Sequence, residues 1–427
     1  MQGFAAPQRD PLPWCLALCL IFLLVCLNRL GLPNKIYFDE IHYVVAARKM
    51  LQGIPANREH PMLGKEVIAA AIAVLGDRPW SWRIPMVLFG TVGLHAFGRL
   101  VWYVSQRPLA TVLAVFLLAT DFLWFCQSRI AMLDMVQAGF GMIALWQFAA
   151  LLRRPDKRPR LRLATCGIAM GLSLGAKWSI APAFILPGLT FLVLRFRHTG
   201  WRLIGRKGAG PVPGISLAEA AFWLALVPLC VYWATYMPGF FWHDRPINPL
   251  APIAQHEYML KLQDSVKRLH PYRSVWYQWM ANWRCIWYLY EFVDGAQRGI
   301  LLIGNPFSML AGLPALAWCA WAVIRRQRLD ALAFVVLYAL TLGIWAINGK
   351  PIQFYYHYLL PAAFLMACLA LALDELWARR DRWRWITPIS LAVTLGMFVY
   401  FYPIISAARL HHGKASFAQY MWLDSWR

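Results

Sequence analysis

The sequence predicts an all-α polytopic membrane protein in which residues 1–427 form a single membrane domain. Hydrophobic residues make up 60% of the chain and charged residues only 15%, whereas an ordinary globular domain carries about 25% charged residues. Mean hydropathy is +0.48, and the apolar residues gather in runs long enough to cross a hydrocarbon core of roughly 30 Å. These observations exclude a disordered chain, a disulfide-stapled secreted domain and a soluble enzyme.

Eleven apolar runs are predicted to cross the membrane. The first has few charges before it and no small-residue cleavage site after it, so we interpret it as a retained anchor. In chain order the runs are Leu12–Leu30, Trp82–Val104, Leu109–Cys126, Ile130–Leu152, Leu163–Trp178, Ile180–Leu194, Ile215–Tyr236, Gly299–Ile324, Ala331–Ile347, Phe354–Leu373 and Trp385–Ser406.

The run Met62–Gly76 is too short to cross the core and carries charges near its start. If it lies along the surface as an interfacial helix, the short basic loops all fall on one side, which the positive-inside rule makes cytoplasmic. We therefore predict the N-terminus inside and the C-terminus outside. The basic residues of these loops are Arg153, Arg154, Lys157, Arg158, Arg160, Arg162, Arg195, Arg197, Arg202, Arg206, Lys207, Arg325, Arg326, Arg328, Arg379, Arg380, Arg382 and Arg384.

This topology accounts for much of the net charge of +22, so we expect membrane lipids as partners and no nucleic acid. The sequence has no CxxC pair and no HExxH motif, so we expect neither a metal site nor a disulfide framework. Two polar regions then lie outside: the first outer loop, residues 31–80, and the large outer loop, residues 238–298. Neither is long enough to form much of a core.

Two adjacent carboxylates, Asp39 and Glu40, follow the first span and open a short helix that runs to about Gln52. One interpretation is an N-cap, in which Asp39 accepts a backbone N–H and favours the helix dipole. The other is a general base, because a carboxylate at an apolar interface is desolvated, which raises its pKa and its basicity. The two roles can coexist.

His60 and Lys65 flank the start of the interfacial helix. Helix N–H groups, a lysine and a histidine suit an anion, although Lys65 could equally extend to the lipid headgroups. Both side chains are candidates for holding a lipid phosphate.

Buried charges mark the outer ends of several spans. Arg129 lies at the turn between the third and fourth spans, with Asp134 about a turn inside. A charge inside the membrane is normally paired or lines a wet cavity, so the alternative to a functional role is a structural ion pair between these two residues. Arg83 and Lys177 occupy similar positions at the starts or turns of other spans.

The outer end of the tenth span carries Lys350, Tyr356 and His357. Tyrosines at such positions usually belong to the aromatic belt, whereas for His357 packing and function are equally weighted. Earlier in the chain, Asn305 precedes a proline that opens or kinks the eighth span.

The large outer loop contains an aromatic segment with His270, Tyr272, Ser274 and Trp276. It suits a sugar face or a peptide, and the alternative is an interfacial packing segment. All these clusters fall at the outer face and predict a pocket with carboxylates and several cations. The cations would hold a phosphate leaving group and a carboxylate would deprotonate an acceptor hydroxyl.

These motifs, in this order, resemble the protein O-mannosyltransferase family of polyprenyl-phosphate-dependent glycosyltransferases, and the resemblance covers most of the chain. The matching motifs are Phe38-Asp39-Glu40, His60-Pro61-Met62-Leu63-Gly64-Lys65, Gln127-Ser128-Arg129 with Leu133-Asp134, Lys177-Trp178, His270-Pro271-Tyr272 with Ser274, Gly304-Asn305-Pro306, and Tyr356-His357-Tyr358 before Pro361.

The resemblance implies a GT-C type helical fold and an inverting transfer of mannose from a polyprenyl-phosphate-linked donor to Ser or Thr of a translocating protein. It implies that Asp39 is the base, with Glu40 beside it, and it requires no cofactor and no metal. The compact form suits a bacterial inner membrane enzyme with its site on the periplasmic side. The residues expected around the donor phosphate are His60, Lys65, Arg83, Arg129 and His357, supported by Asp134, Lys177, Asn305, Lys350 and Tyr356.

Three alternatives stay open at this point. A transferase of the same fold could use a lipid acceptor, as in aminoarabinose transfer to lipid A. A transporter or flippase would show internal repeats and charges near mid-membrane in both halves, whereas the candidate groups here cluster at one face. A non-catalytic scaffold would leave Asp39 replaceable. The sequence leaves the sugar, the acceptor, the length of the lipid carrier and the oligomeric state undetermined, and it does not decide whether Asp39 or Glu40 takes the proton.

Overall fold

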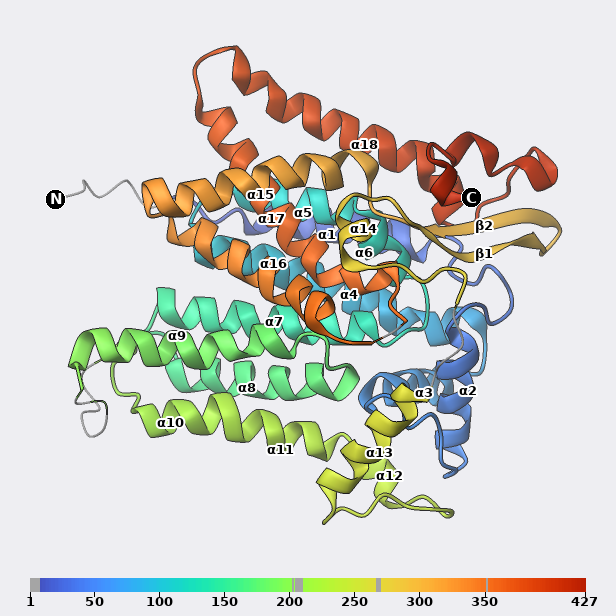
Figure 1. Ribbon diagram of the computed structural model, residues 1–427, viewed down its shortest axis with the longest axis horizontal. Coiled ribbons are helices and arrows are strands. Elements are labelled where there is room, and N and C mark those ends of the chain that lie inside the picture. The colour runs from blue at the N-terminus through green and yellow to red at the C-terminus, as the bar shows by residue number, and fades with distance from the viewer. Residues whose placement is uncertain (1–7, 202, 204–209, 266–269, 351) are drawn as a thin grey trace.

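The computed structural model is a bundle of helices that run side by side, with most of the irregular connections gathered at one end (Figure 1). It describes residues 8–201, 203, 210–265, 270–350 and 352–427. Three of the basic residues predicted to face the cytoplasm, Arg202, Arg206 and Lys207, lie outside the described residues.

Among the described residues, seven helical segments are long and apolar enough to cross a membrane. At a rise of about 1.5 Å per residue, roughly 20 residues match the hydrocarbon core. The segments are α4 (Pro79–Ser105), α7 (Asp134–Arg153), α10 and α11 (Leu217–Ala221 and Val227–Ala234, joined by a π-helical turn), α15 (Pro306–Arg326), α16 (Leu329–Ile347), α17 (Leu359–Ala378) and α18 (Ile386–Ile405).

The other four predicted spans are helical as well. α1 (Leu12–Leu27) and α5 (Pro108–Ala119) are shorter apolar helices. α8 (Pro159–Ala176) and α9 (Ala181–Thr199) carry arginines at one end. The structure therefore confirms a mostly helical, multi-span membrane protein, while eleven crossings stay a prediction.

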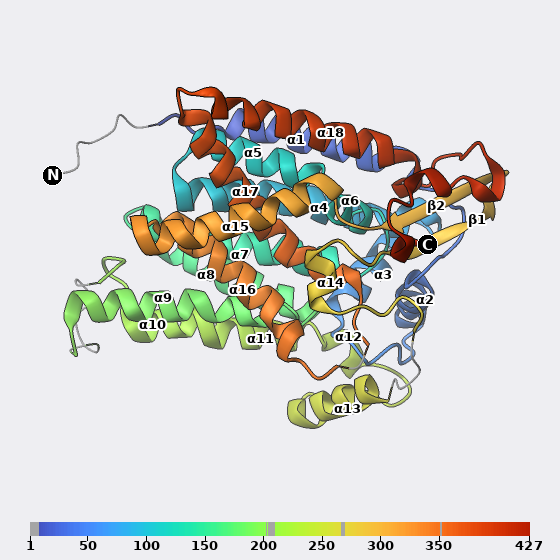
Figure 2. The same cartoon turned by 45° about the horizontal axis from the view of Figure 1, so that its top comes forward.

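The two ends of the bundle differ in the loops that they carry. The connections α7–α8, α15–α16 and α17–α18, which hold basic clusters, lie at the left in Figures 1 and 2, as does the end of α9 with Arg195 and Arg197. α2 (Glu40–Leu51) and α3 (Leu63–Leu75) lie at the opposite end and have 12 and 13 residues, which at about 1.5 Å per residue is too short to cross the core. The loops thus separate as the charge pattern predicts. Which end faces the cytoplasm stays a prediction.

The predicted span Leu109–Cys126 is wrong as one continuous helix. α5 ends at Ala119, and a separate helix, α6 (Phe122–Gln127), follows Asp121. The carboxylate of Asp121 accepts the N–H of Trp124 at 3.0 Å, which is the N-cap hydrogen bond that starts a new helix.

The predicted start of the eighth span at Gly299 is also wrong, because this segment forms a β-hairpin. β1 (Ile286–Val293) pairs antiparallel with β2 (Ala296–Leu302). The turn residues Asp294 and Gly295 both have positive φ, at 49° and 70°, as a tight hairpin turn requires. Three short helices occupy the rest of the large outer loop: α12 (Met237–Phe240), α13 (Pro252–Asp264) and α14 (Trp276–Met280).

α15 begins only at Pro306 because Asn305 caps it. The Asn305 side-chain oxygen accepts the N–H groups of Phe307 and Ser308, and its amide donates to the carbonyls of Thr120 and Thr394 at 3.2 and 3.0 Å. Asn305 is fully buried. It joins three parts of the bundle core and does not line the cavities described below.

Candidate active site

Asp39 occupies the position before the first residue of α2, where a cap is expected. Its carboxylate nevertheless makes no cap hydrogen bond, so the N-cap interpretation is not supported. Burial raises the pKa of Asp39 to about 6, partly offset by His42 and Lys177, and Lys350 also lowers it while Asp134 raises it. A carboxylate with this pKa is ionised at neutral pH and is a better proton acceptor than an ordinary aspartate.

Glu40, the adjacent carboxylate, is fully buried against Arg83. The Glu40 oxygens accept from Nε and Nη2 of Arg83 at 2.8 and 2.9 Å and from the backbone N–H groups of Tyr37 and Ala131 at 3.3 and 3.1 Å. This bidentate pair fixes the first outer loop against α4.

Arg83 has no N–H left for a ligand. Its remaining donors bond the carbonyls of Leu30, Pro33 and Lys35 at 2.7 to 3.1 Å, so all five guanidinium hydrogens are used. The predicted contact between Arg83 and a donor phosphate therefore finds no support in this geometry.

Arg129 is likewise occupied by the backbone. Its Nη1 donates to the carbonyls of Cys26 and Asn28, the latter at 2.8 Å, and its Nη2 to that of Ser406 at 3.3 Å. Arg129 thus caps the last turn of α1 and ties it to the end of α18. Arg129 does not pair with Asp134, so the structural ion pair considered from the sequence is wrong. Arg129 also lines neither of the cavities described below.

Lys65 is fully buried, and its amine donates to the carbonyls of Asn57 and of His60, the latter at 2.8 Å. Burial lowers the pKa of Lys65 to about 7, opposed by Glu66 and Glu59. Lys65 thus uses two of its three N–H donors to hold the loop that carries His60, and it lines neither cavity described below.

Three of the predicted supporting residues come together beside Asp39. Asp134, the first residue of α7, pairs with Lys177, which follows α8, at 2.8 Å. The Lys177 amine also lies 5.0 Å from the ring centroid of Tyr356. The pair is buried, so each charge needs the other.

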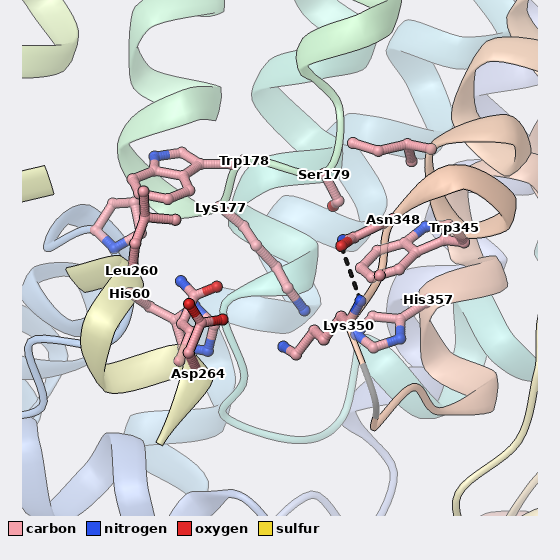
Figure 3. A pocket seen from close by; sticks show the side chains of 14 residues that line it. His60, Lys177, Trp178, Ser179, Leu260, Asp264, Trp345, Asn348, Lys350 and His357 are labelled. Carbon is pink, nitrogen blue, oxygen red and sulfur yellow. Dashed lines mark hydrogen bonds between the residues drawn. The ribbon is translucent and has the colours of Figure 1, made fainter. Parts of the chain in front are cut away.

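A cavity of about 490 Å³ opens next to this pair (Figure 3). We call it the lysine cavity. The side chains of Lys177 and Lys350 extend toward the same part of it, and α13 contributes residues to one wall. Its polar and aromatic lining is His60, Lys177, Trp178, Ser179, Gln263, Asp264, Trp345, Asn348, Lys350 and His357.

The two histidines of the lysine cavity are positioned by their neighbours. His357 stacks on Trp345, with ring centroids 3.8 Å apart, and its Nδ1 accepts the N–H of Phe354 at 3.1 Å. In the neutral ring this leaves the proton on Nε2, as a donor. Burial, together with Lys177 and Lys350, holds the pKa of His60 well below its usual range, so His60 is neutral at pH 7.

A second cavity, of about 500 Å³, is lined mainly by the large outer loop and borders the first at Lys350. We call it the arginine cavity; His270, Arg273, Ser274, Gln278, Arg284 and Lys350 line it. His270 and Ser274, which were predicted to form an acceptor surface, line this cavity, whereas Tyr272 packs against the core; the acceptor role stays a prediction. Trp276 instead lines a separate apolar groove between α15 and α16.

Several residues of the lysine cavity were not predicted. Trp178 belongs to the Lys177-Trp178 motif but was given no role, and Trp345 lies near a helix end, where tryptophans usually belong to the aromatic belt. Gln263 and Asp264 are brought to the cavity only by the docking of α13. His42 was visible beside Asp39, and its charge is now seen to lower the pKa of that carboxylate.

Two family models match this chain. The model for dolichyl-phosphate-mannose-protein mannosyltransferase matches residues 77–243, and the model for the C-terminal four-helix membrane region of protein O-mannosyltransferase matches residues 252–426. A polyprenol-phosphate-mannose–protein mannosyltransferase of Mycolicibacterium smegmatis is 24% identical over 91% of this chain and 87% of that protein.

Two solved structures share the fold. The Saccharomyces cerevisiae protein O-mannosyltransferase Pmt1–Pmt2 complex bound to the sugar donor superposes with a TM-score of 0.84 at 12% identity, covering 99% of this chain and 93% of that one. ArnT from Cupriavidus metallidurans in the apo state gives 0.59 at 16% identity, covering 92% and 76%. With both halves of the chain matched by family models, the chain belongs to the protein O-mannosyltransferase family of membrane glycosyltransferases.

Proposed function

We propose that this protein transfers mannose from a polyprenol-phosphate-linked donor to Ser or Thr hydroxyls of proteins, with Asp39 as the general base. The observation that carries this proposal is the pairing of an uncapped carboxylate of raised pKa with a cavity that holds two lysines. The donor and the acceptor in this proposal are those in the names of the matched family model and of the bacterial relatives.

The lysine cavity suits the phosphate of the donor. Lys350 makes no hydrogen bond through its amine to any described residue, and its pKa is lowered by burial and by Lys177. Two close cations with histidine donors beside them stabilise an oxyanion that gains charge as its bond to the sugar breaks. The volume of about 490 Å³ lies within the usual range for a small-molecule site.

The reaction then needs one proton transfer. The acceptor hydroxyl loses its proton to Asp39 while its oxygen attacks the anomeric carbon. The carbon–oxygen bond to the phosphate breaks, and the electron pair stays on the phosphate held by Lys177, Lys350, His60 and His357. Attack from the side opposite the leaving group inverts the anomeric centre. Glu40 takes no part in this step, because its oxygens are held by Arg83 and two backbone N–H groups.

The site is assigned to the outer, periplasmic face of a bacterial inner membrane. The basic connections gather at the end of the bundle opposite to α2 and the β-hairpin, and the positive-inside rule places basic loops in the cytoplasm.

The test is transfer by the purified protein in nanodiscs. Radiolabelled polyprenyl-phosphate-mannose is offered with a Thr-containing peptide and, separately, with a lipid acceptor. Wild type is compared with Asp39→Asn and with Asp424→Asn, an exposed carboxylate near the C-terminus. Label on the peptide that depends on Asp39 but not on Asp424 supports the proposal. If label appears on the lipid alone, the assigned acceptor changes from protein to lipid. If this donor is not consumed at all, the donor assignment is overturned.

A further inference from the structure

The arginine cavity is positively charged along much of its wall. Arg273, Arg284 and Lys350 line it together with His270, and its described lining includes no Asp or Glu. Such an unbalanced lining focuses positive potential into a hollow of about 500 Å³.

None of these cations has a carboxylate partner among the described residues. The exposed side chain of Arg273 makes no hydrogen bond or ion pair there. Arg284 donates through Nη2 to the carbonyl of Pro271 at 3.1 Å, which positions the guanidinium without neutralising it. The Lys350 amine is also unpaired. Cations with no structural counter-charge are available to an external anion.

The arginine cavity adjoins the lysine cavity at one residue. Lys350 lines both cavities, and its charge acts on Asp39. A chain segment lying in the arginine cavity would therefore run beside the group that deprotonates the acceptor hydroxyl.

The walls favour a polypeptide over a lipid. They come from the loop around residues 270–284, and Arg273 and Tyr277 are exposed. The apolar faces of α15 and α16, against which acyl chains would pack, border a different groove. That groove is lined in part by Trp276 and Met280, whose neighbours Val275, Tyr277 and Gln278 line the arginine cavity. A lipid with its tails in the groove is therefore the competing occupant, which the comparison of uncharged with anionic nanodiscs tests.

We propose that the arginine cavity binds acidic side chains of the acceptor polypeptide, so that the protein prefers Ser or Thr residues with Asp or Glu nearby. The inference rests on the proposed function for its meaning in catalysis, but the binding itself can be measured without the donor.

The experiment compares three peptides that share one Thr-containing core and carry Glu, Gln or Lys at the flanking positions. kcat/KM is measured for wild type, Arg273→Gln and Arg273→Glu. Arg409→Gln is the matched control, because Arg409 is exposed and lines neither cavity. In parallel, binding of the labelled peptides is followed by fluorescence anisotropy without donor, in nanodiscs of uncharged lipid and, separately, in nanodiscs that contain anionic lipid.

For wild type and Arg409→Gln we expect kcat/KM and affinity to favour the Glu peptide over the Gln peptide by about two- to five-fold for each ion pair formed, less at high salt. Arg273→Gln should lower this ratio, and Arg273→Glu should shift the preference toward the Lys peptide. Equal ratios in wild type and both Arg273 variants would overturn the inference. So would an Arg273 effect seen only in nanodiscs with anionic lipid, which would indicate a headgroup site.

Failure of the proposed function gives a different result. If wild type transfers label to none of the peptides yet binds the Glu peptide through Arg273, the transfer proposal fails and the cavity assignment stands. If transfer depends on Asp39 but does not depend on peptide charge, the transfer proposal stands and the assignment of the arginine cavity fails.

Discussion

The Glu40–Arg83 cluster and the lysine cavity lie at the same end of the bundle and use the same kinds of charged groups, but they differ in how the charges are matched. In the cluster, all five N–H groups of Arg83 and both oxygens of Glu40 have partners. In the cavity, Lys177 is paired with Asp134 but the Lys350 amine has no partner among the described residues, and the nearby Asp39 makes no cap hydrogen bond. Charged groups whose hydrogen-bonding atoms all have partners hold the fold together, whereas charged groups that lack a partner remain available to a substrate. The predictions below test this distinction.

Asp39→Asn should give the largest effect on rate. We expect kcat to fall by about 10²–10⁴-fold, as for a lost general base, while the thermal unfolding midpoint stays near that of wild type because the carboxylate makes no cap bond. Single-turnover transfer and unfolding scans in detergent measure the two quantities. A stable variant with near-normal kcat would remove Asp39 from the mechanism.

Glu40→Gln should show the opposite pattern, with the main effect on stability. Neutralising one partner of a buried ion pair leaves the Arg83 charge uncompensated, which typically costs about 3–5 kcal/mol in the free energy of unfolding. Thermal unfolding and the yield of folded protein report the loss. Arg83→Lys serves as the companion variant, since one amine cannot replace five fixed donors. A Glu40→Gln protein with wild-type stability but no transfer would assign the catalytic role to Glu40.

Lys350→Met should weaken use of the lipid-linked donor. A hydrogen bond to a charged group contributes about 1.5–3 kcal/mol, so we expect kcat/KM for the donor to fall by roughly 10–10²-fold. The acceptor KM is measured in the same series, with Arg409→Gln as control. An effect confined to the acceptor KM would place Lys350 in the arginine cavity alone.

The pH profile should show the smallest effect. The base must be deprotonated to act, and the pKa of Asp39 is raised to about 6. The rate should therefore rise with pH, reach half its maximum near pH 6 and level above about pH 7, and at pH 5 it should be roughly one tenth of the plateau. kcat/KM measured from pH 5 to pH 8 tests this. A flat profile across pH 6 would exclude a base with that pKa.

The sequence predicted a site residue well where its type and its position along the chain were enough to single it out. Asp39 before a short helix, and the positions of Lys177, Lys350 and His357, could be singled out because charged residues are rare in an apolar chain. The hydrogen-bond partners of these charged residues were harder to predict. Nothing in the sequence shows that the carbonyls of Leu30, Pro33 and Lys35 turn toward Arg83, or that those near Cys26 turn toward Arg129, because backbone direction in a loop depends on tertiary packing.

The β-hairpin could have been predicted from the sequence, but its signal was overlooked. β1 is rich in aromatic and β-branched residues and is followed by Asp294-Gly295, a pair that favours a tight hairpin turn. The high apolar content of β2 made it resemble the start of the next span. The docking of α13 onto the lysine cavity had no comparable signal, since few of its contacts are local in sequence.

The bond between Arg129 and Ser406 has a consequence for biogenesis. The guanidinium caps α1, the first helix to leave the ribosome, but one of its acceptors is made 277 residues after Arg129 itself. At roughly 5–20 residues per second, about 15–55 s of translation separate the two. Cysteine crosslinking between α1 and α18 in stalled nascent chains should detect the contact only after residue 406 has emerged. Before then α1 can already pack against α4 and α5, so the bond to Ser406 is the last of these Arg129 hydrogen bonds to form.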